Sequence, residues 1–220
     1  MSKANIVVLI SGTGSNLQAI INAVEAGQIA GEIRAVISNR PEAKGLIKAA
    51  AHGIECSVLD HKQFPDRESF DQALLADIDH YQPDLLVLAG FMRILSDDFI
   101  DHYQDRMMNI HPSLLPHFRG LHTHQRVLEA GHAQHGCSVH FVTRELDGGP
   151  LVIQAVIDVH EDDTPESLAA RIQQQEHIIL PLAVQWFAEG RLRCENDCVI
   201  LDGKPLTRPV IWQNQSLHFQ

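Results

Sequence analysis

The chain has little positive charge, few cysteines and no long apolar run. Its 220 residues hold 17 lysines and arginines against 28 aspartates and glutamates, a net charge of −11. Nucleic acids are bound by clustered Lys and Arg, so we expect no nucleic-acid partner. No run approaches the roughly 18 apolar residues that span a membrane, and a signal-peptide pattern is missing at the N-terminus. We therefore expect a cytoplasmic protein without a membrane partner.

Cysteine usage points to the same compartment. The four cysteines are widely scattered and do not form the dense framework of a disulfide-bonded scaffold. Reduced thiols in a reducing compartment are the simpler interpretation. The length fits one domain of ordinary size, or a domain with a small C-terminal addition, and it suffices to bury a core.

Short apolar segments alternate with amphipathic ones along most of the chain. Residues 5–10 are apolar after Asn5 and rich in β-branched side chains, which is typical of a strand buried on both faces of a parallel sheet. Such alternation predicts βαβ crossovers and an α/β fold: a doubly wound, mostly parallel sheet flanked by helices, whose last strands can be antiparallel. Strands are expected at 5–10, 34–38, 54–59, 85–89, 108–111, 138–143 and 152–159, and the main helices at 17–24, 42–52, 65–81, 124–130 and 163–186.

A glycine-rich turn joins the first strand to the first helix. The turn reads Ser11-Gly12-Thr13-Gly14-Ser15-Asn16. Free backbone N–H groups and the helix dipole favour an anion at such a helix start. Position 17 is Leu rather than the third glycine of a dinucleotide site, and the Lys of a triphosphate loop is missing. A small phosphate monoester is the better ligand, and a tight turn without a ligand is the alternative.

Asn109 and His111 lie two residues apart at the end of an apolar run. On a strand this spacing points both side chains to one face. An amide can donate to an oxygen that gains negative charge, and an imidazole can move protons near neutral pH. Asp147 begins a turn after the strand expected at 138–143, and a carboxylate beside an imidazole favours the charged ring. These three residues form a candidate acyl-transfer site.

Histidines are frequent between Pro116 and Gly136. No pair has the helix spacing of a zinc protease site and no Cys-x2-Cys accompanies them, so we expect no metal. A loop beside the active site, followed by the helix at 124–130, is the expected structure.

Three segments together are similar to the signature of the folate-dependent formyltransferase family. They are the run Asn109-Ile110-His111-Pro112-Ser113-Leu114-Leu115-Pro116, the run 120–124 and the run 146–150, and the glycine turn agrees with them. The resemblance covers roughly residues 5–193 and implies a Rossmann-like fold. It implies formyl transfer from 10-formyltetrahydrofolate to the amine of 5-phosphoribosylglycinamide, a step of purine biosynthesis.

The same resemblance implies roles for further residues. Asn109, His111 and Asp147 would be catalytic and His140 auxiliary. The ribonucleotide phosphate and ribose would be held by Gly14, Ser15, Asn16, Gln173 and Glu176. The folate would be held by Arg67, Met92, Arg93, Ile94, Leu95, Asn109, Thr143, Arg144 and Glu145.

The resemblance also suggests how the chain is divided. Residues 1–193 would form the formyltransferase domain, with ribonucleotide phosphate bound by its N-terminal half and folate by its C-terminal half. Residues 194–220 would form a strand pair around Asp202-Gly203 and an irregular tail packed on the same domain. The partners would be small molecules, and the protein a monomer or a homodimer.

Three alternatives stay open. A methionyl-tRNA formyltransferase would need a basic C-terminal domain, and a formyltetrahydrofolate hydrolase carries a regulatory domain before the catalytic one. Both share the Asn, His and Asp constellation. A nucleotide-phosphate binding protein without catalysis would use the glycine turn and leave these three residues without a task.

Overall fold

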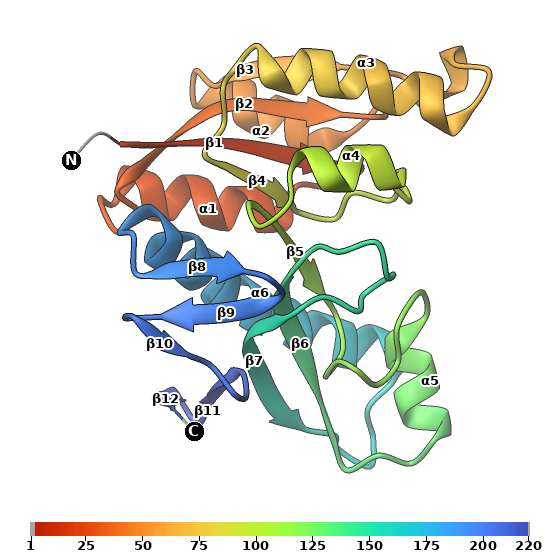
Figure 1. Cartoon of the computed structure of the whole chain (residues 1–220). Coiled ribbons are helices and arrows are strands. Elements are labelled where there is room, and N and C mark those ends of the chain that lie inside the picture. Colours follow the sequence, from red (N-terminus) through yellow and green to blue (C-terminus); the bar gives the residue numbers. More distant parts are fainter. Residues whose placement is uncertain (1–2, 220) are drawn as a thin grey trace.

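The computed structural model describes residues 3–219, and most of its strands form one sheet (Figure 1). Nine strands pair in the order β12-β11-β7-β6-β5-β4-β1-β2-β3. The strands of this sheet are β1 Ala4–Ile10, β2 Gly31–Ser38, β3 Glu55–Val58, β4 Leu85–Leu88, β5 Met107–His111, β6 Gln134–Phe141, β7 Leu151–Asp158, β11 Val210–Gln213 and β12 Ser216–His218.

The helices lie on both faces of the sheet. They are α1 Ser15–Glu25, α2 Lys44–Ala51, η1 His61–Gln63, α3 Arg67–Asp79, α4 Asp97–His102, α5 Thr123–Glu129 and α6 Pro165–Ala188. Alternate residues of β1 pack into two separate hydrophobic cores. Ile6 lies in the core that includes α1 and α6, and Val7 lies in the core that includes α3 and α4. This is the doubly wound arrangement expected from the sequence.

Strand direction changes after β5. The strands β1 to β5 pair in parallel, whereas β6 runs antiparallel to both β5 and β7. The predicted fold class, a mostly parallel sheet with antiparallel strands near one edge, is therefore confirmed. Because β1, β4 and β5 are neighbours, the loops at their carboxyl ends meet at one edge of the sheet, where α/β proteins bind ligands.

The C-terminal segment differs from the expected tail. A second sheet contains β8 Leu192–Glu195, β9 Cys198–Leu201 and β10 Lys204–Pro205, of which β8 contacts α6. The turn at Asp202-Gly203 joins β9 to β10, as expected. The expectation of an irregular tail was wrong, because β11 pairs in parallel with β7 and β12 closes the edge of the main sheet. No helix among residues 3–219 has the length and apolarity to cross a membrane.

Candidate active site

Asn109, His111 and Asp147 come together as the sequence predicts, and His140 joins them. Asp147 lies in the turn between β6 and β7 at φ 50°, and its Oδ1 is 3.5 Å from His111 Nδ1. The same oxygen is 3.9 Å from His140 Nε2. Both the His111 and the Asp147 side chains are only 8% exposed, so solvent screens their attraction weakly. The second carboxylate oxygen accepts a hydrogen bond from the Gly120 N–H at 2.9 Å.

The two imidazoles of this cluster differ in their hydrogen-bond partners. His140 Nδ1 donates to the Phe141 carbonyl at 2.8 Å, and its Nε2 accepts from Asn109 Nδ2 at 3.2 Å, which describes a neutral ring. Burial lowers the pKa of His140 from its ordinary value, in agreement with that state. His111 lies between two acceptors instead, with the Phe118 carbonyl 3.1 Å from its Nε2. A doubly protonated His111 ring would donate to both of these acceptors.

The glycine turn forms a tight junction at the start of α1. Gly14 adopts φ +67°, and a Cβ there would lie 2.6 Å from Gly45 Cα, so both the conformation and the space require glycine. The first N–H groups of α1 have no partner within the helix and are available to an anion. Lys48 Nζ lies 3.4 Å from the Gly14 carbonyl oxygen and adds positive charge beside the turn.

Residues of α6 meet this turn from the far end of the chain. Gln173 Nε2 donates to Ser15 Oγ at 3.0 Å, and Asn16 Nδ2 donates to Glu176 Oε2 at 2.9 Å. Burial raises the pKa of Glu176. The oxygen of the Asn16 amide, Oδ1, is buried without a protein partner. The four polar side chains predicted to hold ribonucleotide therefore lie together, and a groove of about 990 Å³ extends from Ser15 between α1 and α6.

The loop between β4 and α4 presents apolar side chains to solvent. Met92 and Ile94 are each 62% exposed, while Leu95 is buried. Arg93 lies 5.4 Å from the centre of the Phe70 ring, and its Nε is buried without a partner. Arg67 is the first residue of α3. The positive charges of Arg67 and Arg93 both lower the pKa of the Asp71 carboxylate, but burial raises it more, so the pKa of Asp71 lies above its ordinary value. The loop thus combines exposed apolar surface with positive charge.

Arg144 and Glu145 use their side chains elsewhere. Arg144 forms an ion pair with Asp101 of α4, with Nε 2.9 Å from Oδ1, and Glu145 pairs with Arg119. Thr143 precedes them, two residues after the end of β6, and is partly buried. The segment 143–145 therefore stands beside the cluster, but its two charged side chains are occupied by ion pairs.

The loops after β1 and β4 are hydrogen-bonded to each other through Ser11, a residue to which the sequence assigned no separate role. Ser11 Oγ accepts from the Met92 N–H at 2.7 Å and donates to Asn39 Oδ1 at 2.6 Å. Ser11 N also donates to the Gly90 carbonyl at 3.1 Å. Its place in the glycine turn was visible in the sequence, but its contact with the loop after β4 depends on the strand order.

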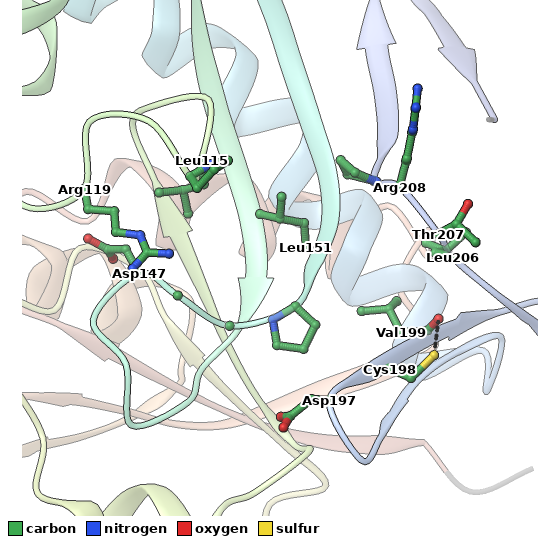
Figure 2. Close-up of a pocket in the computed structure, with 15 residues that line it drawn as sticks. Leu115, Arg119, Asp147, Leu151, Asp197, Cys198, Val199, Leu206, Thr207 and Arg208 are labelled. Carbon is green, nitrogen blue, oxygen red and sulfur yellow. Dashed lines mark hydrogen bonds between the residues drawn. The ribbon is translucent and has the colours of Figure 1, made fainter.

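A pocket of about 400 Å³ lies on the outer side of the turn that carries Asp147 (Figure 2). One wall contains Arg119 and Asp147, and the other contains residues 197–199 and 206–209 of the C-terminal segment. Asp147 belongs to the cluster described above, and its carboxylate is directed to His111 and to the Gly120 N–H. Within residues 3–219, no group of three or more His, Cys, Asp or Glu side chains is arranged to hold a metal ion.

Comparison with known proteins defines the class. The family model described as formyl transferase matches residues 4–184. The chain therefore belongs to the formyl transferase family, as the resemblance in its sequence indicated, and the predicted enzyme class is confirmed.

Within that family the similarity is to one kind of enzyme over nearly the full length. The chain is 54% identical to phosphoribosylglycinamide formyltransferase of Escherichia coli K12 over 202 residues, which cover 92% of this chain and 95% of that protein. It is also 42% identical over 191 residues, 87% of this chain, to 19% of the human trifunctional purine biosynthetic protein adenosine-3. The solved structure of phosphoribosylglycinamide formyltransferase from Coxiella burnetii superposes with a TM-score of 0.90 at 54% identity, covering 93% of this chain and 96% of that one.

Proposed function

We propose that the protein transfers a formyl group from 10-formyltetrahydrofolate to the amine of 5-phosphoribosylglycinamide, giving formylglycinamide ribonucleotide and tetrahydrofolate in purine biosynthesis. One observation carries the proposal: the start of α1 after β1 and the cluster of Asn109, His111 and Asp147 after β5 lie at the same carboxyl edge of the sheet, on either side of β4, and Ser11 links the turn before α1 to the loop after β4. The similarity to phosphoribosylglycinamide formyltransferases over almost the whole chain supports the same conclusion.

The ribonucleotide binds at the start of α1. Backbone N–H groups of Gly14, Ser15 and Asn16 hold the phosphate, and Lys48 adds charge beside them. Gln173 and Glu176 lie against Ser15 and Asn16, within reach of ribose hydroxyls and the amine. The orphaned Asn16 oxygen supplies a buried acceptor that a ribonucleotide hydroxyl or amine can satisfy.

The folate binds between the loop after β4 and the segment 143–145. Exposed Met92 and Ile94 fit the flat ring system, and backbone groups of residues 93–95 would bind its polar edge, since the Met92 N–H already donates to Ser11. Arg67 and Arg93 fit the anionic tail, and the Arg93 Nε without a partner is an observation in favour of that fit. Candidate residues for both substrates thus come from both halves of the chain.

When bound, 10-formyltetrahydrofolate supplies the formyl carbon that the amine attacks. Asn109 Nδ2 has a second hydrogen beyond the one given to His140, and this N–H donates to the formyl oxygen as it becomes anionic. The positive charge of His111, stabilised by Asp147, lies beside that oxygen. One proton leaves the attacking amine and one reaches the leaving nitrogen, through His111 or a bound water. His140 orients Asn109 by accepting its other hydrogen.

Formyl transfer tests the proposal directly. Purified protein is mixed with 10-formyltetrahydrofolate, and the absorbance of deformylated folate is followed with and without the ribonucleotide. Turnover that requires the ribonucleotide is the expected result. Equal turnover without it would identify water as the acceptor and a hydrolase, and ribonucleotide binding without turnover would identify a binding protein.

A further inference from the structure

A row of polar side chains crosses three antiparallel strands beside the proposed catalytic cluster. His111 of β5 is in register with Ser138 of β6, and Ser138 is in register with Gln154 of β7. Residues directly opposite each other on neighbouring strands present their side chains on the same face. All three are at most 8% exposed. Polar groups inside apolar strands are costly unless hydrogen-bonded, so this row needs partners.

Gln154 and Ser138 find these partners in the segment that follows His111. The Gln154 amide donates to the Leu115 carbonyl at 2.8 Å and to Ser138 Oγ at 2.8 Å, which uses both of its hydrogens. Ser138 Oγ accepts from the Leu115 N–H at 3.1 Å and donates to the Ser113 carbonyl at 2.7 Å. Every donor of this buried network is satisfied, so the network holds residues 113–115 in one position.

The anchored residues 113–115 lead into a turn that contacts the His111 ring. Ser113 Oγ donates to the His117 carbonyl at 2.7 Å, which folds residues 113–117 into a compact turn. The next residue, Phe118, provides the carbonyl oxygen that lies 3.1 Å from His111 Nε2. The position of this oxygen therefore depends on the anchors at Leu115 and Ser113. Gln154 itself is separated from the ring by Ser138 and this turn.

We propose that Gln154 is a positioning residue for the transfer reaction. By fixing the segment 113–118 it holds the Phe118 carbonyl against His111 Nε2, and so sets the orientation of the ring whose Nδ1 faces Asp147. The inference rests on the formyl transfer proposed above, in which His111 must face the reacting carbon. A glutamine that only filled space would leave the ring unaffected.

The first test replaces the amide by an apolar side chain of similar volume. Gln154→Met removes both donors, and we expect kcat to fall between about tenfold and a hundredfold, because small displacements of reacting groups have effects of that size. The KM of either substrate should stay within about threefold, since Gln154 touches neither proposed site. The matched control is Gln134→Met, a glutamine at the exposed end of β6 that donates to Asp158 at 3.3 Å; it should keep the wild-type kcat.

A second readout follows the ring without using turnover. Long-range ¹H–¹⁵N spectra show the resonances of the two imidazole nitrogens of His111. These resonances are assigned by their disappearance in the His111→Asn variant. We expect the Nε2 resonance to move in Gln154→Met and to stay in Gln134→Met. If the wild type shows no formyl transfer, the proposed function fails, while this spectrum still tests the positioning of the ring.

Ser138→Ala covers the case in which Gln154→Met folds poorly, and where both variants fold they form a double-mutant cycle. Ser138→Ala weakens the same anchor by a smaller change, and we expect the loss in kcat of the double variant to be no greater than that of the worse single one. Independent, multiplying losses would overturn the proposal. So would a Gln154→Met protein with wild-type kcat and an unmoved Nε2 resonance, or a kcat loss that only matches the unfolded fraction.

Discussion

At the scale of single residues, the Asp147 carboxylate lies between two imidazoles, His111 and His140, whose hydrogen-bond partners differ. His140 is held neutral, because its Nδ1 donates to a carbonyl and its Nε2 accepts from Asn109. His111 faces acceptors with both nitrogens. The Asp147 carboxylate is therefore placed to stabilise a positive charge on His111, the ring beside the proposed reaction centre.

Removing this charge should stop most turnover without unfolding the protein. Asp147→Asn keeps the shape of the side chain and an acceptor for the Gly120 N–H, but it no longer stabilises a positive His111. We expect kcat to fall by about a hundredfold or more, the size found for losing one transition-state contact, with KM little changed. The control is Asp162→Asn, at an exposed position before α6. Steady-state kinetics near wild type for Asp147→Asn would remove Asp147 from the mechanism.

At the scale of elements, the loops after β1 and β4 form one unit through Ser11. Its hydroxyl joins the Met92 N–H of one loop to Asn39 after β2, and its own N–H reaches Gly90. Since one loop begins the proposed ribonucleotide site and the other the proposed folate site, we expect this single side chain to influence both.

Ser11→Ala should therefore weaken the binding of both substrates. The Met92 N–H and the Asn39 amide would lose their partner, and the loop after β4 would be less firmly held. We expect the KM of each substrate to rise several-fold with a smaller change in kcat. Ser57→Ala serves as the control, because it removes a hydroxyl bond of 2.6 Å to Asp77, away from both sites. An increase confined to one substrate would contradict the coupling.

The turn before α1 allows a test of the phosphate site. Gly14→Ala adds a Cβ 2.6 Å from Gly45 Cα at φ +67°, which must displace the turn. Gly27→Ala has a similar backbone strain at φ +71°, at the other end of α1, and meets open space. Gly27→Ala should lose about 1–2 kcal/mol of stability from its left-handed backbone alone, and Gly14→Ala should lose more, because its Cβ also meets backbone. Calorimetry should show weaker ribonucleotide binding for Gly14→Ala alone, and equal affinities of the two variants would exclude the turn as the phosphate site.

Periodicity predicted the elements of this fold because local patterns determine them. Buried parallel strands such as β4, and β1 from Ile6 onward, are continuous apolar runs, and the helix expected at 163–186 is α6, which Thr164 caps. The cluster of Asn109, His111 and Asp147 was predictable because residues two apart on a strand share a face and the family signature supplied the carboxylate.

Contacts that depend on strand register could not be predicted in this way. The pairing of Asn109 with His140 and of Ser138 with Gln154 follows from the antiparallel order of β5, β6 and β7, which no local pattern contains. Polar residues inside apolar strands were the visible signal of these pairs. The tail was misjudged for a similar reason, since β11 and β12 are short and become strands by pairing at the edge of β7.

At the scale of the whole molecule, buried histidines link stability to pH. His135 is 1% exposed and lies 3.0 Å from His124 through ring nitrogens. Burial lowers the pKa of His135 from 6.5 to about 4. The unfolded chain therefore takes up the proton first as the pH falls. The contribution of neutral His135 to stability is complete above pH 6.5 and is lost as the pH falls towards 4, by about 3 kcal/mol in all.

Replacing this ring should flatten the pH dependence. We expect urea unfolding of the wild type to show the free energy of unfolding falling between pH 7 and pH 5, and His135→Asn to show a smaller fall. An exposed histidine in the same comparison, as in His80→Asn, should leave the slope unchanged. A variant of His135 with the wild-type slope would mean that other groups carry the effect.

The central claim is that the formyl group reaches the ribonucleotide amine at the cluster of Asn109, His111 and Asp147. Mass spectrometry of the ribonucleotide after incubation with 10-formyltetrahydrofolate carrying a ¹³C-labelled formyl group tests it most directly. The account predicts that the labelled carbon appears in the ribonucleotide with the wild type and is almost absent with Asp147→Asn. Labelled formate with an unchanged ribonucleotide would contradict the account.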